Sequence, residues 1–488
     1  MFSKCISGFL FLLFSLNCFA DKAKFFSTQH IQQCIDSLHS IGQGKVIIPK
    51  GTHTVGTIFL KSGVELHLEK GAMLKSTQNM NELKWVSNTT ATNKWKSLII
   101  AKDAENISIT GEGTIDGSGA AIAHYLDSLF YRGMLDSSLY QLQEKRPVAH
   151  VRPQIIQFVN CKNVRIEGIT IQNGSSWLQC YDMCKHLTIN NIRVLSNTYW
   201  NNDGIDIVDC QNVKITNSFF DVSDDGICFK SYIRNNINTR CDSVYVANCK
   251  VRSSASAVKL GTSSYGGFTN FLIENIFIYD TYRSAIAIEN WEGGLVENIT
   301  VRNIKAKNTG NAIFIKLNHR GKYNNPIGTL RNILIEHVKA EIPFEQPDYY
   351  YPLPGPALPF FHNVFPASVS GIPGGMVENV VLRNISITYP GRGNASYANI
   401  PAWRLKDVPE KIEEYPEFSM FGELPAWGFY FRHIDGLVLE NVRLKIRHTD
   451  YRPAVIFDDV KNLNTKFVKI KKDEKEEHFV FEPPVKMQ

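Results

Sequence analysis

The sequence has no long hydrophobic run after its first twenty residues, so no later segment has the composition of a membrane-spanning helix. It also has no cysteines paired at the spacing of a zinc site, which argues against the small zinc-binding modules. Lys and Arg total 53 against 47 Asp and Glu and are scattered, so the net charge of +6 gives no argument for nucleic-acid binding. The remaining composition, 43% hydrophobic and 20% charged, is typical of a soluble globular protein.

The first twenty residues predict a cleaved signal peptide. Lys4 precedes an apolar run over residues 6–16, and a small-residue exit ends at Ala20. The run is shorter than the roughly 20 residues that a membrane span needs, and charges follow at once from Asp21. A lipid-modified Cys18 is the alternative, but the residues before it lack the small side chain expected there. We therefore expect a secreted or periplasmic protein, with no membrane span, whose mature part begins at residue 21.

Eight cysteines remain in the predicted mature chain, and most of them lie in segments that resemble β-strands. Small buried thiols are common in such segments, so we expect at most one or two disulfides even in an oxidising compartment. The eight are Cys34, Cys161, Cys180, Cys184, Cys210, Cys228, Cys241 and Cys249.

A repeat with a period of about 25 residues is the strongest organisational signal. Each copy has a turn residue, often Asn, followed by alternating apolar positions, as in Asn163-Val164-Arg165-Ile166. Alternation predicts strands with one buried face, and a fixed period predicts a solenoid in which each repeat buries that face against its neighbours. Asn suits the corners because it tolerates left-handed backbone angles and can bond to the Asn one coil below. The copies begin near residues 106, 163, 187, 212, 243, 271, 295, 332, 379 and 436.

These features predict an all-β fold, a right-handed parallel β-helix, as one catalytic domain over residues 21–488. Leucine-rich repeats are disfavoured because their Leu-x-x-Leu-x-Leu pattern is absent. Residues 28–38 predict a short amphipathic helix that caps the open N-terminal end. Two irregular segments, residues 343–375 and 394–421, are interpreted as long loops that either wall a groove or are passive insertions. A capped solenoid of this kind is expected to be a monomer.

Two acidic phrases, at residues 201–206 and 224–231, carry the candidate chemistry. Asp203 and Asp224 are 21 residues apart, close to one coil, so a parallel solenoid places them on adjacent strands. Asp203, Asp224 and Asp225 can then converge on one patch. Neighbouring carboxylates raise one another's proton affinity, which lets one act as an acid while another stays a base. An isolated Asp-Gly pair would more often mark a turn, but the joint occurrence of three carboxylates favours catalysis.

The phrases resemble glycoside hydrolase family 28, the polygalacturonases and their relatives. The family signature Asn-Thr-Asp-Gly-x-Asp is matched by residues 201–206. The signature Gly-Asp-Asp-Cys-x-x-x-Lys-Ser is matched by residues 223–231, with Ser223 for the leading Gly and Ile227 inserted before Cys228. The resemblance spans most of the mature chain, since it also covers residues 48–51, 60–69 and 173–177.

The resemblance implies an inverting hydrolase that uses a protein acid and an activated water. In such enzymes the two carboxyl groups are roughly 6.5–9.5 Å apart, which leaves room for the water. By position, Asp224 would be the general acid, Asp203 and Asp225 would bind and activate the water, and Asn201 would help to hold the site. No metal or other cofactor is implied.

The chain departs from the family pattern in the next two coils. The histidine of the family's Gly-His-Gly motif is replaced by Ser256, and the Arg-x-Lys motif that grips a substrate carboxylate is replaced by Ala287-Ile288-Glu289. Because Glu289 would repel a uronate, plain homogalacturonan is a doubtful substrate. Ser256 is kept as a candidate substrate-binding residue, and replacement cations are available at Lys259, Lys316, His319 and Arg320.

Aromatic side chains near the acidic phrases are candidate sugar platforms, since their faces pack against the apolar face of a pyranose ring. Trp200 directly precedes the Asp203 phrase and Trp291 follows Glu289, so these two are favoured over Trp177 and Tyr265. Together with Glu292, Glu289 could instead bind the neutral hydroxyls of a branch sugar such as rhamnose or galactose.

The combined expectation is a glycoside hydrolase that cleaves O-glycosidic bonds in pectic or related acidic polysaccharides, of galacturonidase or rhamnogalacturonan type. The mildly basic chain suits a polyanionic sugar. The insertion at residues 343–375 favours action from chain ends, because a loop can block one end of a groove. Two alternatives stay open. A polysaccharide lyase would use Asp203, Asp224 and Asp225 to bind calcium, and a non-catalytic glycan-binding solenoid would bind without turnover.

Overall fold

The computed structural model describes residues 17–18, 26–86, 95–234, 239–322, 325–356, 358, 360, 362–396, 400–471 and 479–482. The predicted signal peptide lies outside the described residues, apart from the backbone of β1 (Asn17–Cys18). Within the described part of the chain, no helix is long and apolar enough to cross a membrane. All eight cysteines expected in the mature chain are buried and none is in a disulfide.

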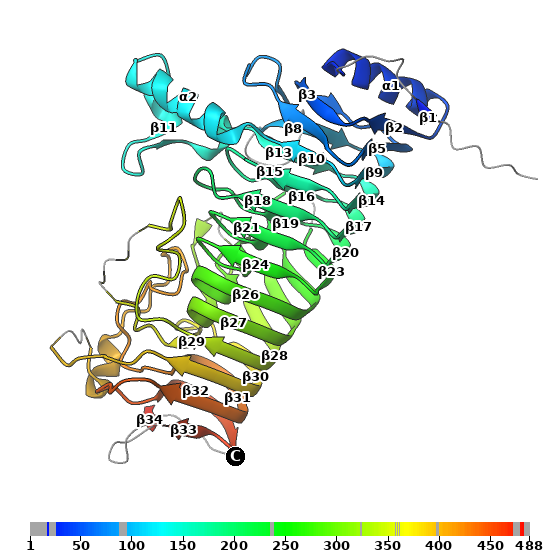
Figure 1. Ribbon diagram of the computed structural model, residues 1–488. Helices are drawn as coiled ribbons and strands as arrows, with labels where there is room; N and C mark the ends of the chain where they lie inside the picture. The colour runs from blue at the N-terminus through cyan, green and yellow to red at the C-terminus, as the bar shows by residue number, and fades with distance from the viewer. Residues whose placement is uncertain are drawn as a thin grey trace, which may run out of the picture.

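The strands wind into one elongated solenoid, in which each strand pairs in parallel with the strand one coil away (Figure 1). Three faces run along it. The first is built from β2 (Gly44–Ile48), β5 (Val64–Leu68), β9 (Glu105–Gly111), β14 (Lys162–Glu167), β17 (Lys185–Asn190), β20 (Gln211–Thr216) and β23 (Cys241–Ala247). The second is built from β3 (Gly51–Val55), β6 (Ala72–Ser76), β10 (Thr114–Asp116), β15 (Thr170–Gln172), β18 (Arg193–Ser196), β21 (Phe219–Val222) and β24 (Lys250–Ser253). The third is built from β4 (Ile58–Phe59), β8 (Lys96–Lys102), β13 (Gln154–Val159), β16 (Gln179–Asp182), β19 (Ile205–Val208), β22 (Ile227–Ser231) and β25 (Val258–Ser264).

From residue 267 onward the strands are longer and bend from one face to the next. β26 (Gly267–Asn290), β27 (Leu295–Leu317) and β31 (Phe429–Ile446) contribute to all three faces. β28 (Thr329–Glu341) and β30 (Val377–Tyr389) cover the first two faces. β29 (Ala367–Ser370) lies on the third face between β27 and β31. The last coils contain β32 (Val455–Lys466), β33 (Lys469–Lys471) and β34 (Phe479–Glu482). The predicted all-β parallel β-helix is therefore confirmed.

Alternating apolar residues fill the inside of the solenoid, as the repeat predicted. In β14, for example, Val164 and Ile166 are buried while Arg165 between them is exposed. The corners are left-handed and frequently Asn, and their amides bond from coil to coil. Asn163 has a φ of 54° and donates to the side chain of Asn106 at 2.9 Å. The corner function of Asn is confirmed.

The predicted N-terminal helix is present as α1 (Thr28–Ser40) at the blue end of Figure 1. It begins because the Ser27 side chain accepts a hydrogen bond from the amide of His30. Its apolar stripe joins the core through Ile31, Ile35 and Leu38. The helix lies at the N-terminal end of the solenoid, and its action as a cap stays a prediction.

Three long excursions leave the coils, and the sequence predicted only two of them. The unpredicted one connects β10 to β13 and carries α2 (Gly119–Tyr131) and the hairpin of β11 (Tyr140–Gln141) and β12 (Arg146–Pro147) (Figure 1). The predicted loop at residues 343–375 is not one loop, because Ala367–Ser370 form β29 and pair with β27 and β31. The third excursion, between β30 and β31, holds one short 3-10 segment (Ala402–Asp407).

Candidate active site

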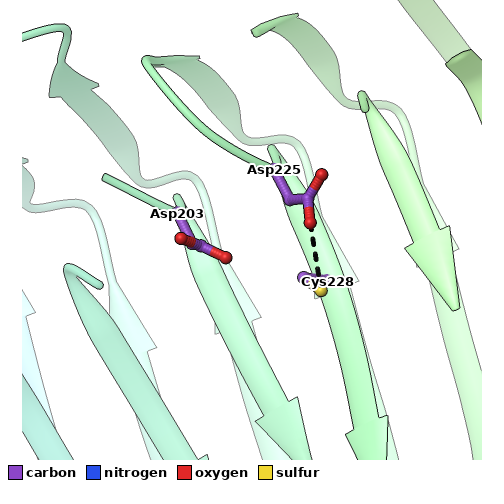
Figure 2. A group of neighbouring side chains, drawn as sticks. All are labelled: Asp203, Asp225 and Cys228. Carbon is purple, nitrogen blue, oxygen red and sulfur yellow. Dashed lines mark hydrogen bonds between the residues drawn. The ribbon is translucent and has the colours of Figure 1, made fainter. Parts of the chain in front are cut away.

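Asp203 and Asp225 each lie two residues before a strand of the third face, on adjacent coils. The strands β19 and β22 start in register, with Ile205 opposite Ile227, and the amide of Gly204 donates to the carbonyl of Asp225 at 2.8 Å. Figure 2 shows the two carboxyl groups side by side at the starts of these strands. Asp203 therefore stacks on Asp225, whereas the sequence spacing had placed it opposite Asp224.

The glycine that follows each of these carboxylates allows the coils to approach closely. A Cβ atom at Gly204 would lie 2.4 Å from the carbonyl oxygen of Gly226, and one at Gly226 would lie 2.7 Å from that of Ala257. Any side chain at these positions would push the coils apart. The two Asp-Gly steps are thus a packing requirement of stacked coils as well as part of the acidic motif.

Asp225 is held in its ionised form although it is only 4% exposed. One carboxylate oxygen lies 3.1 Å from Nζ of Lys259, and the other accepts the amide of Ser256 at 3.1 Å. Burial favours the protonated carboxyl, but the charges of Lys259 and Lys230 outweigh it and lower the pKa of Asp225 below its ordinary value. The predicted binding residue Ser256 therefore contributes its backbone to a carboxylate.

Asp203, unlike Asp225, favours the protonated form of its carboxyl group. It is 3% exposed, and its pKa is raised well above the ordinary value by burial and then by the charges of Asp206 and Asp224. Lys230 offsets part of this effect, with Nζ 3.4 Å from one oxygen of Asp203 and 2.5 Å from Asp206. The second oxygen of Asp203 has no hydrogen-bond partner among the described residues. Asp203 can thus hold a proton or a water.

Asp224 is half-buried and opens outward. Its carboxylate accepts the amide of Asp225 at 2.9 Å and the side-chain amide of Asn201 at 3.3 Å. Asn201 is in turn fixed by Arg152, whose guanidinium donates to it at 2.7 Å. Burial and the charge of Asp225 raise the pKa of Asp224 above its ordinary value. The predicted contact of Asn201 with the site is present in the structure.

A pocket of about 400 Å³ lies over Asp224 and brings together segments that are far apart in the sequence. Two arginines, Arg146 from the β12 hairpin and Arg283 from β26, face it together with Trp200. Buried Nε of Arg283 has no hydrogen-bond partner among the described residues. The remaining lining residues are Gln143, Glu144, Ser223, Ser254, Ala255, Gly355 and Pro356.

Neither arginine was among the predicted site residues. Register gives a signal for Arg283, because its amide donates to Ala255 at 2.9 Å and Ala255 lies one coil beyond Asp224. The sequence gives none for Arg146, which reaches the pocket from the unpredicted excursion. Its guanidinium lies 5.4 Å from the ring centroid of Trp200, the one predicted aromatic platform that lines the pocket.

The predicted replacement cation Lys259 is buried and engaged within the protein. Its Nζ lies 3.1 Å from Asp225, 3.7 Å from Glu289 and 2.9 Å from the hydroxyl of Tyr415. Glu289 is 2% exposed, and burial, opposed by Lys259, raises its pKa to about 7. The structure therefore pairs Glu289 with an ammonium and does not leave it as an isolated repulsive charge. Lys316, on the next coil, is also buried and donates to the carbonyl of Gly371 at 2.9 Å.

Three further predicted binding residues do not line the pocket, and two of them, Trp291 and His319, contact the segment 411–415. Trp291 donates its indole N–H to the carbonyl of Glu413 at 3.0 Å, and the backbone amide of His319 donates to the carbonyl of Ile412 at 2.9 Å. Arg320 lies 2.9 Å from Glu292 and stacks over Trp291, with 4.3 Å to the ring centroid. The excursion between β30 and β31 thus covers the third face beyond the carboxylates.

The cluster of Asp203, Asp225 and Cys228 has the geometry of a possible cation site, since its ligand atoms lie within 4.8 Å of one another (Figure 2). The donor set does not fit one. Burial raises the pKa of the Cys228 thiol well above its ordinary value, and Lys230 and Lys259 already supply positive charge to the carboxylates. A calcium ion also prefers six to eight oxygen ligands.

Comparison with known proteins gives a consistent family assignment. The sequence profile described as Glycosyl hydrolases family 28 matches residues 39–342. The chain is 22% identical over 315 residues to the endo-polygalacturonase of Pectobacterium carotovorum subsp. carotovorum, an alignment that covers 62% of this chain and 76% of that one. It is 24% identical over 360 residues to the exo-poly-alpha-D-galacturonosidase of Dickeya chrysanthemi, covering 65% of this chain and 57% of that one.

Solved structures share the fold. The hyperthermoactive exopolygalacturonase from Thermotoga maritima superposes with a TM-score of 0.59 at 22% identity, covering 75% of this chain and 87% of that one. The family 28 exopolygalacturonase of Yersinia enterocolitica gives 0.58 at 17% identity, covering 96% and 78%. The profile match extends over more than half of the sequence and contains the acidic motifs. The chain therefore belongs to glycosyl hydrolases family 28.

Proposed function

We propose that this family member is a secreted hydrolase that cleaves O-glycosidic bonds in acidic pectic polysaccharides or oligosaccharides with inversion. The observation that carries the proposal is the contrast between Asp224 and Asp225. These consecutive carboxyl groups have pKa values shifted in opposite directions, and only Asp224 lines the pocket. Such a separation is how one site holds an acid and a base at the same pH.

In the proposed mechanism Asp224 is the general acid, because it lines the pocket and its raised pKa favours the protonated form. It protonates the leaving oxygen as the bond from that oxygen to the anomeric carbon breaks. A water attacks the opposite side of the carbon and gives its proton to Asp225, which is ionised and fixed by Lys259. The unpartnered oxygen of Asp203 helps to hold that water.

The pocket favours an anionic sugar. Arg146, which is also paired with Glu144, and Arg283 face the same space as Asp224, and both guanidinium groups can form charge-assisted hydrogen bonds to a uronate carboxylate. They offset the loss of the family's Arg-x-Lys pair, while Glu289 has its charge compensated by Lys259. The names of the relatives, an endo-polygalacturonase and an exo-poly-alpha-D-galacturonosidase, support a galacturonate-containing substrate.

The walls of the pocket favour action from chain ends, of galacturonidase or rhamnogalacturonan type. Gly355 and Pro356 approach from the excursion after β28, and residues 143–146 approach from the β11–β12 hairpin. The first wall is anchored, because the amide of Gly355 donates to Asp348 at 2.6 Å and that of Leu353 to Asn197 at 2.9 Å. A closed pocket admits a chain end more readily than a chain middle.

The test is a product screen of the purified protein against homogalacturonan, rhamnogalacturonan and their oligosaccharides, read by mass. Saturated mono- or disaccharides released by the wild type but not by Asp224→Asn are the expected result. Unsaturated products would identify a lyase, and binding without release would identify a glycan-binding protein. Either outcome overturns the proposed chemistry, and long mixed products would overturn the exo action alone.

A further inference from the structure

The second face of the solenoid carries a row of positions on which cations predominate. The row begins on β18 and passes through β21, β24, β26, β27, β28, β30, β31 and β33, one residue on each strand, all in register. The sites on β21 and β26 are Phe219 and Phe277, and that on β30 is Ser386. The other six are the exposed residues Arg193, Lys250, Lys305, Lys339, Arg443 and Lys469, which we call the basic row.

The basic row differs from the first face in how its charges are compensated. Within the described residues, none of its six members lies within 4.0 Å of a carboxylate. The first face shows the contrast, because its outward arginines alternate with acids. Arg302 lies 2.7 Å from Glu274, and Arg331 lies 2.8 Å from Glu297. Uncompensated cations stacked one coil apart, about 4.8 Å, repel one another unless a polyanion lies along them.

Aromatic rings separate the cations in the first half of the row. The ammonium of Lys250 lies 5.7 Å from the ring centroid of Phe219, 5.6 Å from that of Phe277 and 4.7 Å from that of Tyr279. Phe277 and Tyr279 are stacked, with ring planes 11° apart. Arg193 also lies 5.0 Å from the centroid of Phe219, and Lys305 lies 5.6 Å from that of Phe277. The half-exposed rings therefore space the cations along the row and leave their charge available to the carboxylates of a sugar polymer.

A shallow groove of about 650 Å³ runs beside this aromatic part of the row. Phe219 and Lys250 contribute to its lining from the row, and the corner residues Asn217, Asn248 and Asn275 line its other side. These Asn side chains bond to one another from coil to coil at 3.2–3.3 Å, which holds their amides in a regular line. Amides of this kind suit sugar hydroxyls, while the neighbouring cations suit carboxylates.

We infer that the basic row and this groove form a second, non-catalytic binding surface for an acidic polysaccharide. The surface is on the second face, whereas the carboxylates and their pocket are on the third. The inference rests on the proposed function, because the same polymer would then contact both faces. A second contact raises the effective concentration of chain ends near the pocket without any change in the pocket itself.

The test compares two triple variants with the same change of charge. Lys250→Glu, Lys305→Glu and Lys339→Glu together reverse the centre of the basic row. Lys70→Glu, Lys185→Glu and Lys214→Glu together reverse three exposed lysines outside it. Binding to immobilised polygalacturonate is measured at low and physiological salt, and turnover is measured on the polymer and on a short oligogalacturonide.

The expected result is that the basic-row variant binds the polymer about tenfold or more weakly and loses most of the salt dependence, whereas the control variant does not. Turnover of the short oligosaccharide stays at the wild-type rate in both. Equal polymer binding by the two variants, or tighter wild-type binding to DNA or anionic vesicles than to polygalacturonate, would overturn the inference. Because binding is measured without turnover, a protein that cleaves no pectic glycan but loses polymer binding in the basic-row variant would contradict only the proposed function.

Discussion

Asp203 and Asp225 are stacked one coil apart, yet burial leaves the first with a raised pKa and Lys259 leaves the second with a lowered one. Two carboxyl groups in these two states can bind the same water molecule. Asp203 can hold the water by a hydrogen bond, and Asp225 can accept its proton. The half-buried Asp224 supplies the third carboxyl group, on the side of the pocket. In the proposed inverting mechanism each of the three carboxyl groups has one part, and the directions of their pKa shifts support that proposal.

Replacing the proposed acid tests that assignment. Asp224→Asn removes the proton donor but keeps the shape of the side chain, so we expect kcat on an oligogalacturonide to fall about 10²- to 10⁴-fold. The KM should change little, because the side chain acts mainly in the transition state. Asp435→Asn, on the first face, is the control and should keep the wild-type rate. A variant that retains more than a tenth of kcat would exclude Asp224 as the acid.

The pH profile should respond to Lys259. The base must be ionised, so activity falls on the acidic side as pH drops through the pKa of Asp225. Lys259→Met removes the nearest charge that lowers this pKa, and the acidic limb of kcat/KM should move to higher pH. The matched control is Lys316→Met, an equally buried lysine that bonds to carbonyl groups.

Removal of Lys259 also has a cost in stability, which must be measured separately. The change leaves Asp225 and Glu289 buried without their partner, and breaking such a pair costs about 3–5 kcal/mol. Thermal unfolding of each variant shows whether the pH profile comes from folded protein. An unmoved acidic limb in folded Lys259→Met would contradict the assignment of Asp225 as the base.

Selectivity for free uronates should depend on Arg283. Arg283→Met removes hydrogen bonds to a carboxylate worth about 1.5–3 kcal/mol, so the KM for oligogalacturonide should rise about 10- to 100-fold. The preference for the free acid over its methyl ester should fall in parallel. Arg283 also lowers the pKa of Asp224, so the alkaline limb of the profile should move to higher pH in the variant. The control Arg331→Met, on the first face, should leave the KM, the preference for the free acid and the alkaline limb unchanged.

The length of the products should depend on the wall formed by Gly355 and Pro356. Deletion of residues 349–356 opens the pocket beside Asp224, and we expect longer oligosaccharides among the first products. The viscosity of a polymer solution should then fall faster for each bond cleaved, which is a direct measure of internal cleavage. If a folded deletion variant releases the same products as the wild type, the wall formed by Gly355 and Pro356 does not determine product length.

Chelation separates the hydrolase from a lyase. Extensive dialysis against a chelator should leave the release of saturated sugars unchanged, because Lys230 and Lys259 supply the charge that a cation would bring. Added calcium should restore nothing, since nothing is lost. Loss of activity with the chelator and recovery with calcium would favour the lyase alternative.

The sequence predicted the features that repeat. Alternating apolar positions and frequent Asn corners recur along the solenoid, so the parallel β-helix could be read from them, and α1 could be read from its amphipathic stripe. The three carboxylates could be read as a group because one coil separates them. Their pairing was one residue off, since the register follows Ile205 and Ile227 and not the acidic residues themselves.

The sequence did not predict what the long excursions bring to the site. Arg146 arrives from a hairpin whose position relative to Asp224 depends on the packing of residues 117–153, and no repeat encodes it. Lys259 was expected to bind substrate, but its contacts with Glu289 and Tyr415 join segments up to 156 residues apart. The sign of the charge on each side chain could be predicted from the sequence. Which side chain forms the ion pair with it could be determined only from the structure.

The arrangement of the site on successive coils has an evolutionary consequence. The three carboxyl groups proposed as the acid and the water-binding pair are on two coils, whereas the arginines come from a hairpin and from a later coil. Under the proposed function, substitutions in the hairpin can change which glycan is accepted without touching the three carboxyl groups, whereas a change of Arg283 also shifts the pKa of Asp224. The residues proposed to select the glycan and those proposed to cleave it are therefore encoded in largely separate parts of the chain, so substrate preference can change by substitution in an insertion alone.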